Sequence, residues 1–262
     1  MPRLYPLFSG SSGNCYYIGS AESGILIDAG RSAKQIENAL SENGLSIKNV
    51  KSIFVTHEHT DHVQGLRVLS TRHKIKVYAS GGTIEALKEK NLINDKVDIA
   101  PITLDGMEID DMKMKPFRIS HDCAEGFGYV VESSDGRKTA FATDTGYITD
   151  SMSEALYGCD TVVIESNHDV RMLQNGDYPY ILKKRILSDI GHLSNDTCAE
   201  KLVGLVKSGT TRFVLAHLSR ENNIPYLAKQ TAICALSENK MKQNIDFMLT
   251  VAAEKDNAAL IY

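Results

Sequence analysis

The stretch Thr56-His57-Glu58-His59-Thr60-Asp61-His62 is the part of the chain from which a fold can be inferred. It follows the apolar run Ile53-Phe54-Val55, which predicts a buried strand. It precedes residues 63–69, which begin like a helix. The histidines and the aspartate therefore lie where a strand gives way to a helix.

The spacing within this stretch is typical of a metal site. His57 and His59 are two residues apart in extended chain, so their imidazoles can converge on one ion. Asp61 and His62 are adjacent where the helix begins, so they can reach a second ion beside the first. Divalent metals bind imidazole and carboxylate together, and paired ions about 3.5–4 Å apart commonly activate water against a phosphate or carbonyl. The alternative is an Asp61 that caps a helix, with the histidines exposed.

Composition narrows the class of protein. With 262 residues, 42% hydrophobic and 24% charged, the chain fits one large α/β domain spanning residues 1–262. Five scattered cysteines without a CxxC pair, and no secretory signal or membrane-spanning run, predict a cytoplasmic protein that does not enter a membrane. The formal charge of −4 gives no general attraction to nucleic acid, so such binding requires a local patch or the metals.

Strands alternate with helices in the first hundred residues, and consecutive strands follow from residue 102. No linker, repeat or low-complexity segment divides the chain. We expect helices at 32–43, 83–90, 151–157, 180–190, 197–207 and 226–236. We expect strands at 3–8, 14–18, 25–28, 53–55, 76–79, 107–109, 112–119, 126–132, 138–143, 161–164, 212–216 and 247–251.

Three further polar residues lie at predicted strand ends, where active-site residues of α/β sheets accumulate. They are His121, Asp144 and His217. A lone histidine at such a place is more often structural, and Asp144 has the alternative of a turn or helix cap. Asp28, also at a strand end, is either a turn residue or a carboxylate that holds the metal loop in place.

The small polar loop at residues 9–14 has two interpretations. Its hydroxyl groups, its backbone and Asn14 can hold a phosphate through N–H and O–H donors, or the loop is simply a tight hairpin turn. The basic run Lys183-Lys184-Arg185 is usual for a solvated helix face.

The order HxHxDH, His, Asp, His resembles the metallo-β-lactamase superfamily over nearly the whole chain. The resemblance implies a four-layer αββα sandwich with two divalent metal ions, which can be Zn, Mn, Fe or Ni. It implies His57, His59 and His121 as ligands of the first ion. It implies Asp61, His62 and His217 as ligands of the second ion, with Asp144 bridging the two.

Four segments narrow the resemblance to the YycJ/WalJ group, which are regarded as bacterial metal-dependent 5′→3′ DNA exonucleases. These segments are residues 8–14, 165–169, 191–195 and 218–223. Two of them also resemble tRNA 3′-processing endonucleases, in which a Glu supports a His that protonates the leaving oxygen, and Glu165 and His192 match that pair. The chain lacks an evident long arm for tRNA. Only 47 residues separate Asp144 from His192, too few for the extra domain of the large nucleases of the superfamily.

The resemblance implies phosphodiester hydrolysis, most of all at single- or double-stranded DNA ends. His192, oriented by Glu165, is the candidate proton donor, because the pKa of a histidine beside a carboxylate can lie near working pH. His168 competes for that role, and Asp61 counts as both ligand and catalytic residue. His73, in a basic run, is expected to be inert. Candidate substrate contacts are Ser12, Asn14, His168, Arg185, Ser194 and Asn195.

Two other functions remain open. The same metals can hydrolyse a small molecule, either a cyclic phosphodiester or a thioester, in a closed pocket rather than an open basic groove. A third hypothesis is a non-catalytic protein that keeps its metals for stability. The complete ligand set, together with Glu165 and His192, argues against it, because a decayed site should have lost some of these residues. The sequence leaves the native metal, the choice of DNA or RNA, strand preference, polarity and oligomeric state undecided.

The ligand assignment gives the first testable prediction. Asp144→Ala should abolish most activity and release at least one metal, because a bridging carboxylate serves both ions. Metal content per chain, measured by elemental analysis after dialysis, checks this. Two ions retained at full occupancy in the variant would show that Asp144 is not the bridge.

Overall fold

The computed structural model describes residues 3–255 and 260–261 of the chain. It divides into two compact units. The first comprises Met1–Pro116, Cys123–Phe127 and Ala253–Tyr262, and the second comprises Phe117–Asp122 and Gly128–Ala252. The expectation of a single domain over residues 1–262 stays a prediction.

The first unit is built on a seven-stranded mixed sheet with the order β14-β1-β2-β3-β4-β5-β6. The pairs β1–β2 and β2–β3 are antiparallel, whereas β3 to β6 run parallel to one another. The central strand β3 is an apolar run because side chains on both of its faces are buried. The strands are β1 (Arg3–Phe8), β2 (Cys15–Gly19), β3 (Gly24–Ile27), β4 (Val50–Phe54), β5 (Lys76–Ala79), β6 (Ile99–Pro101) and β14 (Leu260–Ile261).

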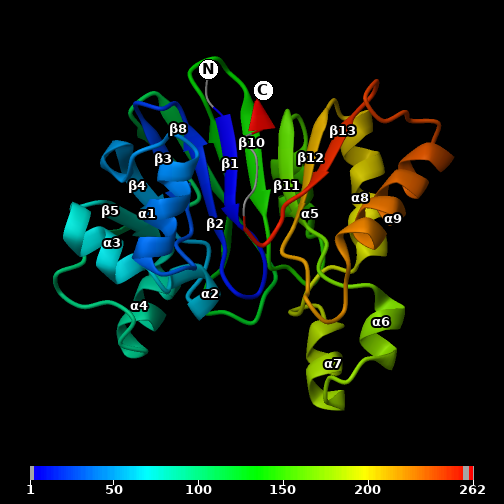
Figure 1. Ribbon diagram of the computed structural model, residues 1–262, viewed down its shortest axis with the longest axis horizontal. Helices are drawn as coiled ribbons and strands as arrows, with labels where there is room; N and C mark the ends of the chain where they lie inside the picture. Colours follow the sequence, from blue (N-terminus) through cyan, green and yellow to red (C-terminus); the bar gives the residue numbers. More distant parts are fainter. Residues whose placement is uncertain (1–2, 256–259, 262) are drawn as a thin grey trace. The chain divides into compact units, whose positions relative to one another are not determined.

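The helices of the first unit pack on one face of this sheet, beside β3 to β5 (Figure 1). Ile36 and Leu40 of α1 lie one turn apart and are buried against alternate strand residues such as Leu26 and Ile53. A capping box between Ser32 and the residue three positions on begins α1. The helical elements are α1 (Ala33–Glu42), the 3₁₀ turn η1 (Ile47–Asn49), α2 (Thr60–Val63), α3 (Leu66–His73) and α4 (Gly81–Glu89).

The hairpin of β7 (Met107–Ile109) and β8 (Met112–Arg118) is antiparallel, with Met107 opposite Met114, and β8 continues into the second unit. There, β9 is antiparallel to β10, and β10 to β13 run parallel in sequence order. The register sets Ala142 beside Ile164, and Ile164 beside Leu215. These strands are β9 (Phe127–Glu132), β10 (Lys138–Ala142), β11 (Thr161–Glu165), β12 (Arg212–Ala216) and β13 (Met248–Val251).

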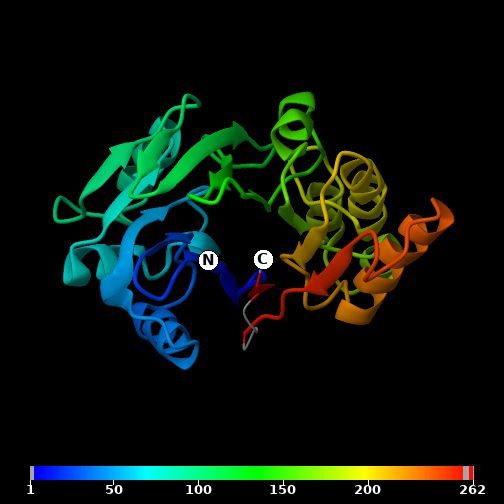
Figure 2. The same cartoon turned by 90° about the horizontal axis from the view of Figure 1, so that it is seen from above.

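Two long helices cover β11 to β13 of the second unit and contact each other side by side (Figure 2). Helix α8 begins at the cap Ser194, and α9 has Pro225 in its first turn. Buried leucines of both helices join the strand core, among them Leu202 and Leu236. The helices are α5 (Asp150–Leu156), α6 (Val170–Asn175), α7 (Tyr180–Ile186), α8 (Asn195–Lys207) and α9 (Pro225–Glu238).

The predicted α/β class is confirmed, and most predicted elements lie within two residues of their observed bounds. The helix predicted at 180–190 is wrong in length, because α7 ends at Ile186 and a turn follows in which Gly191 donates to Ser188. Helix α6 was not predicted. Its six residues are too few to show a helical period. No helix among the described residues is both long and apolar enough to cross a membrane.

The core of the second unit yields a stability prediction. Leu202→Ala should lower the free energy of unfolding by about 2–5 kcal/mol, because a fully buried leucine leaves a cavity that the sheet cannot fill. Urea denaturation measures the change. Glu200→Ala, an exposed position on the same helix, is the control and should stay within about 0.5 kcal/mol of the parent. Equal effects at both positions would contradict the assigned core.

Candidate active site

In the first unit, the candidate residues follow the carboxyl ends of the parallel strands β3 and β4. Ile27 is paired with Phe54, and the next residue, Asp28, donates its backbone N–H to the Phe54 carbonyl at 2.8 Å. Asp28 has a φ of +62°, a left-handed conformation that aspartate tolerates better than most residues. The chain therefore turns sharply at Asp28, at the edge of the sheet where ligands of open α/β sheets bind.

Backbone hydrogen bonds join three loops at this edge. Asn14 donates to the carbonyl of Asp61 at 2.7 Å, and Ala29 donates to the carbonyl of His62 at 2.8 Å. Gly30 donates to the carbonyl of Asn14 at 2.8 Å. A Cβ at Gly30 would lie only 1.7 Å from the Asp61 carbonyl oxygen, so only glycine fits there. The HxHxDH loop is thus held by its neighbours rather than by its own helix.

Asp28 both makes this turn and orients two of the histidines through its carboxylate, so the two interpretations left by the sequence apply together. Its oxygens accept hydrogen bonds from the Thr56 backbone at 2.8 Å and from the Thr56 hydroxyl at 2.9 Å. Nδ1–H of His62 donates to Oδ2 at 2.7 Å. Burial raises the pKa of Asp28, and the charge and hydrogen bond of His62 oppose that rise.

His57 is oriented by the same carboxylate through Thr56. Because the Thr56 hydroxyl gives its one proton to Asp28, it accepts the hydrogen bond from Nδ1–H of His57 at 3.0 Å. Both His57 and His62 are fully buried, and both are left with an Nε2 lone pair, the form that binds a metal. The ring centroids of His57 and His59 are 4.5 Å apart. Nε2 of His62 lies 3.6 Å from Oδ2 of Asp61.

The two candidate substrate contacts of the first loop have partners within the unit. Oδ1 of Asn14 accepts the backbone N–H of Gly10 at 2.9 Å, and its Nδ2 lies 3.1 Å from Nε2 of His62. The hydroxyl of Ser12 contacts Arg31 at 2.5 Å and also Glu254, and these two residues form an ion pair of 2.9 Å. A substrate role for Ser12 and Asn14 stays a prediction.

Glu58, inside the histidine motif, has a structural task that the sequence did not reveal. Its carboxylate is 4% exposed and accepts the backbone N–H of Ala124 at 3.1 Å. Lys90 of the loop after α4 lies 3.2 Å from the same oxygen. Glu58 therefore fixes the segment 123–127, and the spacing of the motif alone gave no sign of this partner.

In the second unit, the candidate residues also follow strand ends. His121 comes after β8, Asp144 after β10 and His217 after β12, and Glu165 is the last residue of β11. Asp144 and His217 have φ values of +56° and +53°. Non-glycine residues in this region are uncommon and cluster at functional sites. The three strand-end residues that the sequence proposed are thus in one unit, beside Glu165.

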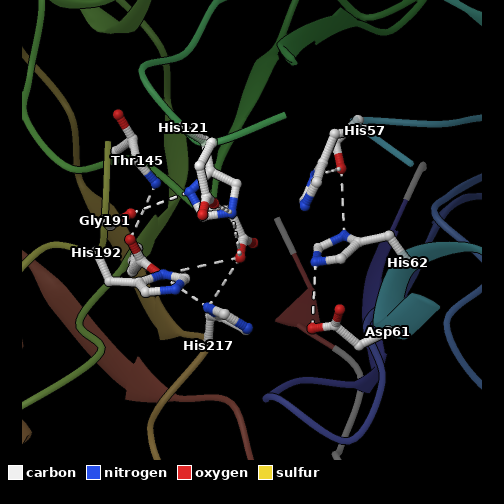
Figure 3. Close-up of polar contacts among 12 residues, drawn as sticks. His57, Asp61, His62, His121, Thr145, Gly191, His192 and His217 are labelled. Atoms are coloured by element: carbon white, nitrogen blue, oxygen red, sulfur yellow. Dashed lines mark hydrogen bonds and ion pairs between the residues drawn. The ribbon is translucent and has the colours of Figure 1, made fainter. Parts of the chain in front are cut away.

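Glu165 is the centre of this group and is fully buried. Its Oε1 accepts Nδ1–H of His217 at 2.7 Å and Nδ1–H of His192 at 2.8 Å. Its Oε2 accepts the backbone N–H of Thr145 at 3.0 Å (Figure 3). The same oxygen accepts the backbone N–H of Leu193 at 3.0 Å. Burial raises the pKa of Glu165, but the charge of His192 and the two histidine hydrogen bonds outweigh it and lower the pKa to about 2. Glu165 is therefore a permanent carboxylate.

His121 and Asp144 complete the donors of the second unit. Nδ1–H of His121 donates to the carbonyl of Gly191 at 3.0 Å, which leaves Nε2 as the metal-binding nitrogen. Burial lowers the pKa of His121 and so favours that neutral form. Oδ1 of Asp144 lies 3.3 Å from Nδ1 of His217 and 4.0 Å from Nε2 of His121.

The donor chemistry fits divalent metal ions. Imidazole Nε2 and carboxylate oxygen are their usual ligands, and each Nδ1 described above has the hydrogen bond that orients such a ligand. Within the second unit, one ligand atom each of Asp144, Glu165, His192 and His217 lie within 4.8 Å of one another. Because both oxygens of Glu165 already accept hydrogen bonds, we assign it to orienting the histidines rather than to the metal.

A buried amide network holds the loops around Glu165, and the sequence did not reveal it. Asn195 and Asn223 exchange two hydrogen bonds of 2.9 and 3.0 Å between their side chains. Oδ1 of Asn195 also accepts the Ser166 hydroxyl at 2.7 Å, and Nδ2 of Asn167 donates to the His217 carbonyl at 2.9 Å. Asn195 is 2% exposed, so its predicted substrate contact stays a prediction for which the structure offers a competing role.

The remaining candidates of the second unit also have defined surroundings. Arg185 forms a two-bond ion pair with Asp122, with Nε to Oδ2 at 2.5 Å and Nη2 to Oδ1 at 2.8 Å. Ser194 caps α8 by accepting the N–H of Thr197 at 3.1 Å. His168 is 1% exposed, neither ring nitrogen has a hydrogen-bond partner among the described residues, and burial lowers its pKa to about 4. Substrate contacts by all three stay predictions.

Comparisons with known proteins identify the family. The family model described as Beta-lactamase superfamily domain matches residues 24–218. The chain belongs to this superfamily. It is 40% identical over 234 residues to Exodeoxyribonuclease YycJ of Bacillus anthracis, covering 88% of each chain. It is 36% identical over 245 residues to Exodeoxyribonuclease WalJ of Streptococcus pneumoniae serotype 2, covering 92% of this chain and 90% of that one. The predicted YycJ/WalJ resemblance is confirmed.

Solved structures share the fold at low identity. The metallo-β-lactamase fold protein YhfI from Bacillus subtilis has a TM-score of 0.73 at 13% identity, covering 99% of this chain and 100% of that one. The short form of human tRNase Z has a TM-score of 0.65 at 16% identity, covering 99% and 98%. The predicted metallo-β-lactamase fold is confirmed. The superfamily and the donor sets support two divalent metal ions, while the individual ligand assignments stay predictions.

The Asp28 network gives a prediction about metal affinity. Asp28→Asn should weaken binding of one metal about 10–100-fold, because an amide cannot accept all the hydrogen bonds that orient His57 and His62. Competition against a chelating dye measures the affinity. Asp110→Asn is the control, since Asp110 is also an aspartate with positive φ in the first unit but is paired with the exposed Lys51. Unchanged affinity in Asp28→Asn would show that this carboxylate does not support a metal ligand.

Proposed function

We propose that this protein is a metal-dependent exodeoxyribonuclease that hydrolyses phosphodiester bonds at DNA ends in the 5′→3′ direction. The observation that carries the proposal is the Glu165–His192 pair, which lies outside the metal-ligand series of a chain whose curated relatives are named exodeoxyribonucleases. A metal site alone suits many hydrolases, whereas a separate proton donor suits a reaction with a basic leaving oxygen.

The protein residues divide into ligands and proton carriers. Seven residues would hold the two ions: His57, His59, Asp61, His62, His121, Asp144 and His217. When bound, such ions supply activation of water and neutralisation of phosphate charge. Hydrogen bonds to Nδ1 keep four of these histidines in the tautomer that binds metal through Nε2. The acceptors are Asp28, Thr56, Glu165 and the carbonyl of Gly191. The bound ions would compensate the negative charge of the substrate phosphates. The protein therefore needs no general positive charge, and its formal net charge is −4.

His192 is the residue suited to donate a proton to the leaving oxygen. Its Nδ1–H is held by Glu165, so Nε2 is the nitrogen that can carry and release a proton. Its side chain is 12% exposed, which allows contact with a substrate. His168, the competing candidate, is 1% exposed and its pKa of about 4 keeps it neutral at neutral pH. His73 is paired with Glu37 at 2.8 Å, in keeping with an inert role.

An assay on end-labelled DNA tests the proposal. Metal-loaded protein is incubated with single- and double-stranded oligonucleotides labelled at either end, beside a cyclic phosphodiester and a thioester. The proposal expects mononucleotides to be released from the 5′ end. Hydrolysis of a small molecule with intact DNA would overturn it in favour of the small-molecule hydrolase.

The His192 assignment predicts a dependence on the leaving group. His192→Ala should cut hydrolysis of DNA by about 10²–10⁴-fold, the usual contribution of a general acid, and should leave both metals bound. Hydrolysis of bis(4-nitrophenyl) phosphate should change little, because nitrophenolate leaves without a proton. Steady-state rates on both substrates and metal content measure this.

His73→Ala is the matched control for His192→Ala and should behave like the parent on both substrates. Equal losses on DNA and on the nitrophenyl ester in His192→Ala would mean that His192 positions phosphate or binds metal. In that case His168 would become the better candidate for the acid.

A further inference from the structure

The segment between β11 and α8 of the second unit carries the short helix α7, whose inner side is fully accounted for. Ile186 is buried, and Nζ of Lys183 donates to the carbonyls of Gln174 at 2.9 Å and Gly176 at 2.6 Å. Arg185 is bound to Asp122. Two of the three residues of the basic run therefore fasten α7 to the unit and do not face solvent as free charges.

The outer side of α7 is a stripe of Tyr180, Ile181, Lys184 and Leu187, called the α7 stripe below. Residues 180, 184 and 187 are spaced four and three apart, so they share one helix face, and 181 borders it. Tyr180 is 78% exposed and Ile181 is 82% exposed, and Lys184 and Leu187 are exposed as well. Among the described residues, four of the eleven exposed large hydrophobic residues lie between 180 and 190. Isolated exposed apolar residues are ordinary, whereas a contiguous group indicates a binding surface.

Backbone hydrogen bonds at the end of α7 and in the turn after it join this segment to His192 and to the neighbour of His121. The backbone N–H of His192 donates to the carbonyl of Ile186 at 3.0 Å, at the end of α7. Asp122 donates to the carbonyl of Ile190 at 3.1 Å, next to His121. A Cβ at Gly191 would lie 2.2 Å from the Ile186 carbonyl oxygen, so the turn is closely packed. The α7 stripe is therefore held in a defined relation to His192 and His121 within one unit.

We propose that the α7 stripe binds unpaired nucleotides of a single-stranded nucleic acid held at the candidate active site. The proposal rests on the proposed function and names the part of the substrate that the protein grips. An exposed tyrosine ring offers a stacking surface to any base, Ile181 and Leu187 extend it, and Lys184 supplies the charge that a phosphate requires. Base stacking needs no sequence readout, as suits an exonuclease that works along a strand.

The composition of the α7 stripe favours nucleic acid over a second copy of the chain. Lys184 lies in the middle of the stripe, between Tyr180 and Leu187. Lysine is depleted from the cores of protein–protein interfaces, where its charge would be buried without a partner. Against a phosphodiester backbone, the same lysine gains a counter-charge. Self-association is therefore one outcome of the test below rather than the proposal.

Steady-state kinetics on single-stranded DNA test the α7 stripe. The double substitution Tyr180→Ala with Ile181→Ala should raise KM by about tenfold or more, as expected for a lost stacking contact, with a much smaller change in kcat. Tyr180→Phe, which keeps the ring, should retain the parent KM. Ile245→Ala is the control, because Ile245 is 77% exposed but lies in the loop before β13. Hydrolysis of bis(4-nitrophenyl) phosphate checks that each variant has an intact metal site.

The outcomes distinguish the proposal for the α7 stripe from the proposal that the protein is an exonuclease. An unchanged KM in the double variant overturns the stripe and leaves the exonuclease proposal standing. Sedimentation equilibrium tests self-association. If the parent is a dimer, and the double variant is a monomer with an unchanged KM, the α7 stripe binds a second copy of the chain and the nucleic-acid proposal is overturned. If the parent does not cleave DNA, anisotropy of a labelled oligothymidine decides. If the parent binds the oligonucleotide and the double variant does not, the result supports nucleic-acid binding by the α7 stripe but not the exonuclease activity. If the parent does not bind it, both proposals are overturned.

Discussion

The arrangement of the second unit depends on one buried carboxylate, Glu165, and on the four donors that surround it. A buried charge without partners costs several kcal/mol, so the fold must bring Thr145, His192, Leu193 and His217 to it from three separate loops. The same four contacts fix the tautomers of two histidines with different assigned tasks, one as metal ligand and one as proton donor. Loss of any one donor would leave the buried charge of Glu165 less compensated. The amides of Asn195 and Asn223 hydrogen-bond to each other and so hold two of the surrounding loops together.

Asp28 has the corresponding position in the first unit. It lies just after a parallel strand, where Glu165 is the last residue of one, and like Glu165 it accepts Nδ1–H of a histidine. It reaches a second histidine through the Thr56 hydroxyl. The two carboxylates differ in what determines their ionisation. For Asp28 burial prevails and raises the pKa, whereas for Glu165 the two histidines prevail and lower it to about 2. Each unit therefore brings its own preorganised donors, and the histidines need little rearrangement to bind metal.

The sequence predicted what depends on local pattern and missed what depends on contacts distant in the chain. The strands and helices follow from apolar periodicity, and the HxHxDH spacing with three strand-end residues suggested the metal donors. The left-handed turns at Asp28, Asp144 and His217 have no pattern that residue types alone reveal. Arg185 appeared to be a free cation because Asp122 lies 63 positions away in the sequence. Asn195 appeared to be a loop residue because its partners Ser166 and Asn223 lie 29 and 28 positions away in the sequence.

In the second unit, the segment that can carry substrate contacts is joined to the residues that orient the histidines. Solved structures below 25% identity share the fold, so this fold is compatible with wide change in sequence. The segment between β11 and α8 is the natural place to change what is bound, since it is a surface excursion. Its last residues, however, supply the Gly191 carbonyl to His121 and the ring of His192 to Glu165. The segment can therefore vary at α6 and α7 but must return to the same turn, so any substrate surface on it begins beside His192.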